Sequence, residues 1–176
     1  VAFMHSFLED KKLHIVMEWA REGDLAVVIK KAKKNRSPLK EERILTIFFQ
    51  CCAALNFMHS QHVLHRDIKP ANIFLTRSGD QCDIVKLGDF GIAKVLAHTM
   101  ARAKTVAGTP FYMAPELCQE RPYTIAADCW SLGCVLHELC RLDVPFTATS
   151  MAALVRKIVS GRPKSLPYQY SAELKS

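Results

Sequence analysis

The feature that most constrains this chain is a polar loop set between apolar segments. Residues 65–72 read His-Arg-Asp-Ile-Lys-Pro-Ala-Asn, and they lie between the apolar pair Val63-Leu64 and the β-prone run 73–75. A second polar loop, Asp-Phe-Gly at 89–91, follows the apolar run 84–87. Together the loops carry three oxygen-bearing side chains, those of Asp67, Asn72 and Asp89. Because carboxylate and amide oxygens are hard ligands, they indicate a site for Mg²⁺.

These side chains suit the transfer of a phosphoryl group. Such a group needs little covalent help, so a protein mainly holds the metal ions of the nucleotide and orients the attacking oxygen. The fixed residues of His-Arg-Asp-x-Lys-x-x-Asn arise by chance about once per few million starting positions, at roughly 5% usage per residue type. A third string, Gly-Thr-Pro-Phe-Tyr-Met-Ala-Pro-Glu, follows at 108–116. Three such strings in this order are a specific signal.

Composition narrows the class of protein. The 176 residues are enough for one domain with a sizeable core, and 49% apolar residues exclude wholesale disorder. No apolar run is long enough to span a bilayer and no signal peptide is visible at the start, so we expect no membrane partner and a cytoplasmic location. The seven cysteines contain no C-x-x-C pair and lie mostly in apolar helical stretches. We interpret them as buried reduced thiols, in preference to a disulfide or zinc framework.

The net charge of +7 is concentrated in one short stretch, which contains Lys30, Lys31, Lys33, Lys34 and Arg36. Two interpretations stay open. The stretch is either a solvated helix end and loop, or a docking patch for acidic partners or phosphorylated substrates. Nucleic-acid binding is not supported, because no aromatic pattern or binding motif accompanies the basic run.

Hydrophobic patterning predicts two hairpins. Apolar, β-prone runs over 1–7 and 13–18 flank a polar turn at 9–12, and a turn at 77–80 joins the run 73–75 to the run 84–87. The segment 92–109 is polar and lacks periodicity, and we interpret it as mobile.

Four helices are also expected. Gly23-Asp24 opens a short helix that ends near Lys34, and a second helix over 41–60 has one apolar face. Residues 126–139 are apolar nearly all round, which is typical of a buried core helix. Residues 150–160 form an amphipathic helix closed by Gly161. The apolar face of the second helix consists of Ile44, Phe48, Cys51, Leu55 and Met58.

Over its whole length the chain resembles the middle of a eukaryotic protein kinase domain, and it is most similar to the NIMA-related serine/threonine kinases. The strings that carry the second resemblance are Leu-His-Ile-Val-Met-Glu-Trp at 13–19, Ala-Asn-Ile-Phe-Leu-Thr at 71–76, Ala-Lys-Thr-Val-Ala-Gly-Thr-Pro at 103–110 and Leu-Pro-Tyr-Gln-Tyr-Ser-Ala-Glu-Leu at 166–174. The resemblance implies a protein-kinase-like α+β fold. Residues 1–18 would be a hairpin remnant of the β N-lobe, 19–24 the hinge region, and 25–176 a truncated, mostly α-helical C-lobe.

The same resemblance implies ATP and Mg²⁺ as cofactors and gives each loop residue a role. Asp67 would be the catalytic base, Lys69 would contact the moving γ-phosphoryl group, and Asn72 and Asp89 would hold the two magnesium ions. Lys69 and Thr109 resemble the residues of kinases that act on serine and threonine in protein substrates. Ala71 stands where kinases that prefer upstream arginine often carry an acid, so we expect a weak basic preference, with an apolar one possible as in the NIMA-related relatives.

The adenine site is expected just after the first hairpin. By resemblance Met17 is the gatekeeper, the Glu18 carbonyl and the Ala20 backbone hydrogen-bond adenine, Asp24 reaches the ribose, and Phe74 forms the floor of the pocket. Each side chain also has a plain interpretation. Met17 and Phe74 would then be ordinary core residues, and Asp24 a helix cap.

Thr105 occupies the place of activating phosphorylation in many kinases. A phosphate there would pair with Arg66 and Lys94 and order the loop, added by an activating kinase or by autophosphorylation; the alternative is an unmodified, solvated threonine.

Three further residues have structural roles by the same resemblance. His65 looks catalytic in isolation, but the resemblance makes it a packed residue that touches Phe90. Asp128 would accept backbone N–H bonds near His65 and Arg66, because an unpaired buried carboxylate is costly. Glu116 would pair with an arginine beyond residue 176, and it would lack that partner in this chain.

The resulting functional expectation has two parts. The parent protein transfers phosphate from ATP to serine and threonine hydroxyls of protein substrates, without a nucleic-acid or membrane partner, and family analogy associates it with the cytoskeleton or cilium. The 176-residue chain alone is expected to be inactive and poorly stable, because the Gly-rich loop, the strand lysine with its helix glutamate, and the last helices would lie outside it. The alternative is a non-catalytic kinase-like binding module, which the retention of Asp67 and Asp89 disfavours. A metabolic small-molecule kinase is disfavoured by the peptide-docking-like segment 107–115.

Overall fold

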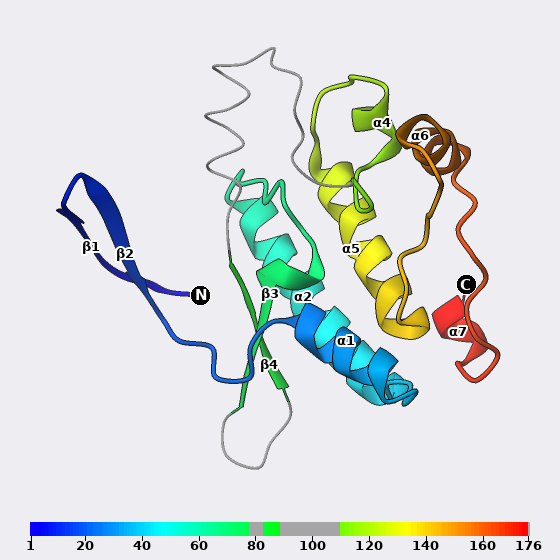
Figure 1. Ribbon diagram of the computed structural model, residues 1–176, viewed down its shortest axis with the longest axis horizontal. Coiled ribbons are helices and arrows are strands. Elements are labelled where there is room, and N and C mark those ends of the chain that lie inside the picture. The colour runs from blue at the N-terminus through cyan, green and yellow to red at the C-terminus, as the bar shows by residue number, and fades with distance from the viewer. Residues whose placement is uncertain (78–82, 89–109, 176) are drawn as a thin grey trace.

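A computed structural model describes residues 1–77, 83–88 and 110–175 (Figure 1). The described residues form two separate antiparallel strand pairs, β1–β2 and β3–β4, together with helices of very different length. This mixture confirms the expected α+β class. The elements in chain order are β1 (Phe3–Glu9), β2 (Lys12–Met17), α1 (Leu25–Lys34), α2 (Glu41–Ser60), the 3₁₀ turn η1 (Pro70–Asn72), β3 (Ile73–Arg77), β4 (Asp83–Leu87), α4 (Pro115–Cys118), α5 (Ile125–Arg141), α6 (Met151–Ser160) and α7 (Ala172–Lys175).

The first hairpin, β1–β2, projects away from the helices (Figure 1). Asp10 and Lys11 have φ angles of 48° and 60°, and two consecutive positive φ angles are what a two-residue type I′ turn requires. The register pairs Glu9 with Lys12 across this turn. Every residue of both strands is exposed. The predicted hairpin is confirmed, with β1 lying two residues further along the chain than the predicted run.

The connection over 18–24 runs from this hairpin along β3 into α1. The Leu75 N–H donates to the Gly23 carbonyl at 2.9 Å, and the Glu22 N–H donates to the Leu75 carbonyl at 3.2 Å. At its end Asp24 caps α1, because its Oδ1 accepts from the Val27 N–H at 2.9 Å. The connection is therefore held beside the strand that follows the 65–72 loop.

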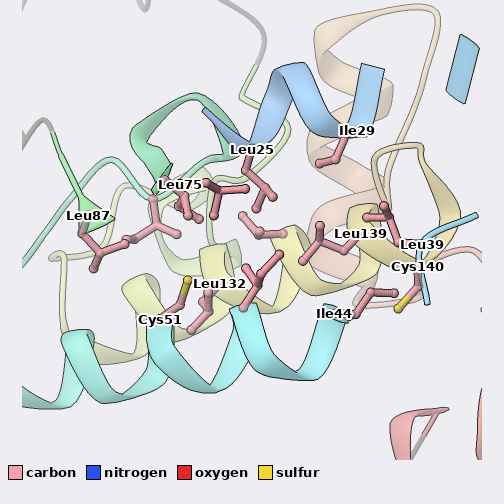
Figure 2. Close-up of a cluster of buried hydrophobic side chains, with 14 of the residues drawn as sticks. Leu25, Ile29, Leu39, Ile44, Cys51, Leu75, Leu87, Leu132, Leu139 and Cys140 are labelled. Carbon is pink, nitrogen blue, oxygen red and sulfur yellow. The ribbon is translucent and has the colours of Figure 1, made fainter. Parts of the chain in front are cut away.

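The core lies where α2 and α5 pack against each other, and α1 and the β3–β4 pair cover it. Figure 2 shows Ile44 and Cys51 of α2 facing α5, with Leu25 of α1 and Leu75 of β3 on the opposite side of the cluster. Leu25, Ile44 and Leu75 are completely buried, and burying such a side chain contributes about 1.5–3 kcal/mol.

The predicted apolar face of α2 needs one correction. The helix spans the expected residues, but Ile47 is fully buried and Phe48 only half-buried. Neighbouring positions on a helix differ by about 100°, so Ile47 and Phe48 both lie near the apolar stripe of α2. The packing partners of the helix determine which of the two side chains is fully buried.

α5 is less uniformly buried than a helix that is apolar all round would be. Ile125 and Cys129 are exposed, while Leu132, Val135 and Leu139 belong to the core. Ile125 belongs to the first turn of α5 and lines the same pocket as His59 of α2. The prediction of a core helix is confirmed for one face only.

α6 begins and ends where the sequence predicts. The Ser150 hydroxyl accepts from the Ala153 N–H at 3.3 Å, and Gly161 follows the helix with a φ of 63°. A left-handed residue at this position is common at helix ends, and glycine adopts it without steric cost.

The C-terminal segment returns to the connection between α1 and α2. The Tyr170 hydroxyl donates to the Leu39 carbonyl at 3.1 Å, and the Ser171 N–H donates to Glu41 Oε2 at 2.9 Å, which closes loops of 131 and 130 residues. The cysteines in the described ranges are all free thiols. None of the helices in those ranges has the length and hydropathy needed to cross a bilayer.

Candidate active site

The loop over 65–72 is anchored by Asp128, a fully buried residue near the start of α5. Its Oδ2 accepts from the His65 N–H at 2.9 Å, and its Oδ1 accepts from the Arg66 N–H at 3.0 Å. A buried carboxylate without such donors would be costly. These are the two hydrogen bonds that the family resemblance implied.

Two side chains that the sequence analysis missed complete the shell around Asp128. His59 Nε2, in the last turn of α2, lies 2.9 Å from Oδ2, and the Tyr123 hydroxyl donates to Oδ1 at 2.6 Å. Burial alone would raise the pKa of Asp128, but the hydrogen bonds from Tyr123, His59 and the two backbone N–H groups outweigh it, so the pKa lies below its usual value. The sequence contains no direct indication of His59 or Tyr123. It indicates only that a buried carboxylate needs several hydrogen-bond donors.

The backbone of the loop turns sharply at Arg66. Its φ of 66° lies in the left-handed region, which a non-glycine residue adopts at a cost of about 1–3 kcal/mol. The hydrogen bonds of the His65 and Arg66 N–H groups to Asp128 hold the chain in this turn. The α5 helix thereby determines the direction in which the chain enters Asp67.

Asp67, Lys69 and Asn72 lie together, as the sequence predicted. Lys69 Nζ donates to Asp67 Oδ2 at 2.8 Å, and Asn72 Nδ2 donates to the same oxygen at 2.9 Å and to the Asp67 carbonyl at 2.8 Å. Asn72 is 4% exposed, whereas the Asp67 side chain is 20% exposed. Lys69 and Asn72 therefore both orient the carboxylate, which keeps part of its surface exposed.

The donor set around Asn72 fits a hard metal ion. Because the amide nitrogen of Asn72 is used by Asp67, its side-chain oxygen is the atom left to accept or ligate. Gly88, the residue before Asp89, donates its N–H to the Asn72 carbonyl at 3.0 Å. Oxygen donors of this kind suit Mg²⁺. Among the described residues no group of three or more His, Cys, Asp or Glu could hold a metal ion.

Several expected residues fall outside the described ranges. They are Asp89, Phe90, Lys94, Thr105 and Thr109. The contact between His65 and Phe90, the metal role of Asp89 and the phosphate partners of Thr105 are therefore predictions that the structure does not test.

The residues expected around adenine come from the end of β2, from the connection that leads to α1, and from β3. Met17 is 40% exposed, which does not fit an ordinary core residue, and Ala20 is buried. Asp24 forms an isolated β-bridge with Phe74, whose ring lies so close to Gly88 that a Cβ there would come within 2.6 Å of Phe74 Cε2. Asp24, the Phe74 ring and Gly88, the residue before Asp89, are thus neighbours. The Asp24 carboxylate itself makes the helix cap that was the plain alternative.

The Glu18 carboxylate contacts other residues of this chain, whereas the predicted contact with adenine uses the Glu18 backbone carbonyl. The carboxylate pairs with Lys86 of β4 and accepts from the Ala2 N–H at 3.2 Å. These contacts tie the end of β2 to β4.

The remaining predicted residues differ in their surroundings. His65 is completely buried, and this burial lowers its pKa, which favours the neutral ring. Glu116 is half-buried and makes no ion pair with any residue that the structure describes, and its pairing with a later arginine stays a prediction. The half-buried Arg66 guanidinium likewise has no carboxylate partner within the described ranges.

A cavity of about 400 Å³ lies where the end of α2 meets the start of α5. None of the residues predicted to bind nucleotide or metal lines it. Its lining residues are His59, His62, Leu64, Thr124, Ile125 and Ala126.

Comparison with known proteins agrees with this geometry. The protein kinase domain family matches residues 1–175. The serine/threonine-protein kinase Nek1 of Mus musculus is 45% identical over 177 residues, covering 100% of this chain and 14% of Nek1. Nek3 of Mus musculus is 47% identical, covering 99% of this chain and 33% of Nek3, and Nek2 of Homo sapiens is 48% identical, covering 92% and 37%. The chain thus spans between about a seventh and somewhat over a third of the length of these relatives.

Proposed function

Because the chain belongs to the protein kinase domain family, we propose that it carries the catalytic loop of a serine/threonine kinase, which transfers the γ-phosphoryl group of ATP to protein hydroxyls. The observation that supports this most directly is the joined group of Asp67, Lys69 and Asn72, with contacts of 2.8–2.9 Å. The similarity to Nek1, Nek2 and Nek3 favours serine and threonine as acceptors.

In this proposal Asp67 is the residue that orients the substrate hydroxyl and accepts its proton. Lys69, whose ammonium already contacts Asp67, is placed to contact the γ-phosphoryl group as negative charge shifts in the transition state. Asn72 and Asp89 would hold Mg²⁺, which neutralises phosphate charge when bound. Tyr123, His59 and Asp128 act indirectly, because they fix the backbone that leads into Asp67.

The nucleotide would lie against the segment that joins the first hairpin to α1. We assign Met17 as gatekeeper, the Glu18 carbonyl and Ala20 backbone as adenine partners, Asp24 as a ribose partner and Phe74 as the pocket floor. The exposure of Met17 and the closeness of Phe74 to Gly88 support this assignment. Residues 1–18 are then an N-lobe hairpin, 19–24 the hinge and 25–176 the C-lobe.

Regulation would act through Thr105. A phosphate there brings nearly two negative charges, and Arg66 and Lys94 are its proposed partners. The Arg66 guanidinium supports this, since within the described residues no carboxylate pairs with it. Thr105→Ala is expected to lower turnover in the whole protein. Unchanged turnover in an active enzyme whose Thr105 is shown to be unmodified would contradict this role.

The wider setting follows from the same family. We propose protein substrates with a weak basic or an apolar preference, an activating kinase or autophosphorylation, and a cytoplasmic location with association to the cytoskeleton or cilium. These proposals rest on the relatives and not on a contact in the structure.

A phosphoryl-transfer assay on the whole protein tests the proposal. ATP labelled at the γ-position is incubated with peptides that contain serine, threonine or tyrosine, and Asp67→Asn is compared with Asp143→Asn, which changes an exposed carboxylate in the same way. General-base catalysis typically contributes about 10²–10⁴-fold, so Asp67→Asn should lose activity on that scale while Asp143→Asn keeps it. Equal activity of the two variants would overturn the role of Asp67. Absence of any transfer, with protein partners still bound, would favour a non-catalytic module.

A further inference from the structure

The C-terminal half of α1 presents an unusually dense group of cations to solvent. The helix buries Leu25, Ile29 and Ala32 against the core, and its lysines all point away from that face. The cations that are exposed are Lys30, Lys31, Lys33, Lys34 and Arg36, and we call these five residues the α1 basic face. Apart from the Asp24 cap, α1 has no acidic residue in its first turn.

Helix stability does not account for this arrangement. Lysines in the last turn interact favourably with the helix dipole, which is a reason for one or two of them. However, Lys30 lies three and four positions before Lys33 and Lys34, and like charges at this spacing destabilise a helix. The sequence Lys-Lys-Ala-Lys-Lys therefore costs the helix some stability when nothing acidic lies against it.

The structure supplies very little acidic charge to the α1 basic face. Within the described ranges, Lys33 makes the only ion pair of this face, with Asp143 Oδ1 at 3.6 Å, and its side chain is 62% exposed. The other oxygen of Asp143 is bound by Lys164 Nζ at 2.9 Å. Asp143 thus joins the face to a second basic segment, which also contains the exposed Arg162. The cationic surface is larger than the sequence alone shows.

We propose that the α1 basic face is a docking surface for an acidic segment of a partner polypeptide, with carboxylate or phosphorylated side chains. A one-turn spacing of lysines on a helix and a second basic segment beside it suit an extended chain of anions. The face contains no aromatic side chain on which a base could stack, which disfavours single-stranded nucleic acid. This inference does not depend on catalysis by the chain.

The position of the face leaves the catalytic loop free. The N-terminal end of α1 adjoins Phe74 through Asp24, whereas the basic face begins at Lys30, six residues later and about 9 Å further along the helix. A partner held at the α1 basic face could therefore present another of its segments to Asp67 at the same time.

Fluorescence anisotropy with the whole protein that contains this chain tests the proposal. The probes are a labelled oligoglutamate peptide, a peptide of the same length with phosphoserines, a neutral glutamine peptide and an oligothymidylate. The first variant is Lys30→Glu/Lys31→Glu/Lys34→Glu. The matched control is Lys11→Glu/Lys12→Glu/Arg156→Glu, which makes the same change of net charge at exposed residues of the first hairpin and α6. Circular dichroism checks that each variant is folded.

We expect the acidic peptides to bind at low salt and the neutral peptide not to bind. The α1 variant should bind the acidic peptides roughly tenfold more weakly than the control variant does, since each exposed ion pair contributes modestly. If glutamate at the end of α1 unfolds the chain, the triple change to glutamine removes the charges without opposing the helix dipole, and the same comparison applies. Preference between the carboxylate and phosphoserine peptides identifies the anion, and either one supports the proposal. Equal weakening in the α1 and control variants, no binding of either acidic peptide, or tighter binding of oligothymidylate at the same lysines would overturn it.

Discussion

Replacing Asp128 with asparagine removes a buried charge while keeping the shape of the side chain. Oδ1 accepts from the Arg66 N–H at 3.0 Å and the Tyr123 hydroxyl at 2.6 Å, and Oδ2 accepts from the His65 N–H and His59 Nε2, both at 2.9 Å. Whichever way the new amide is turned, its NH₂ group faces the backbone N–H of either His65 or Arg66. One of these two donors therefore loses its acceptor.

The magnitude follows from the value of these hydrogen bonds. An unsatisfied buried donor costs about 1–3 kcal/mol, and bonds to a charged acceptor are worth roughly 1.5–3 kcal/mol against about 0.5–1.5 kcal/mol for neutral ones. The lost donor and the weaker remaining bonds together should lower the free energy of unfolding by about 3 kcal/mol. Urea denaturation of the chain, followed by circular dichroism, measures this difference.

The matched control is Asp143→Asn. The Asp143 side chain is 41% exposed and pairs with Lys164, so its replacement should cost less than about 1 kcal/mol. Equal losses in the two variants would refute the argument that burial and four donors make Asp128 important. If Asp128→Asn does not fold, Tyr123→Phe removes one 2.6 Å bond, and a loss of about 1.5–3 kcal/mol is expected.

Three further predictions concern the same fold. The pKa of Asp128 in the folded protein lies below its usual value of 3.8, so the charged carboxylate contributes its full stabilisation above pH 3.8. This contribution is lost as the pH falls through the folded-state pKa. Asp128→Asn should therefore make the free energy of unfolding depend less on pH at the acid end of the range. Arg43→Ala should lower the free energy of unfolding, measured by urea denaturation, by about 3 kcal/mol, since Arg43 Nε lies 2.6 Å from Asp83, whose side chain is 6% exposed. Arg77→Ala should lower it clearly less, because Arg77 Nε lies 3.6 Å from Asp83 and the Arg77 side chain is more exposed than that of Arg43. The reverse order would contradict the geometry. Gly161→Ala should lower the melting temperature through a loss of about 1–2 kcal/mol, because φ at this position is 63°; an unchanged melting temperature would show that the helix end relaxes.

The parts of the fold that sequence reasoning predicted well are those specified by neighbouring residues. Ser150 and Gly161 bracket α6, and the turn at Asp10 and Lys11 joins two β-prone runs, so each signal lies within a few residues of the structure it determines. The meeting of Asp67 with Asn72 is also local, because the η1 turn brings residues five apart together.

The parts that could not be predicted depend on residues far apart in the chain. His59 and Asp128 are 69 residues apart, and nothing in either neighbourhood indicates that the two side chains meet. The link from Lys33 through Asp143 to Lys164 is of the same kind. The choice between Ile47 and Phe48 for the core is local but depends on the partners that α2 packs against, which periodicity does not contain.

The contacts of Tyr170 and Ser171 with the α1–α2 connection have a kinetic consequence. They join residues about 130 positions apart, and the entropy cost of closing so long a loop must be met before either contact stabilises the chain. We therefore expect the contacts of Tyr170 and Ser171 to form last during refolding and to open first by local fluctuation. In native-state hydrogen exchange the Ser171 amide should exchange sooner than amides in the middle of α2, even though it donates to Glu41 Oε2 at 2.9 Å.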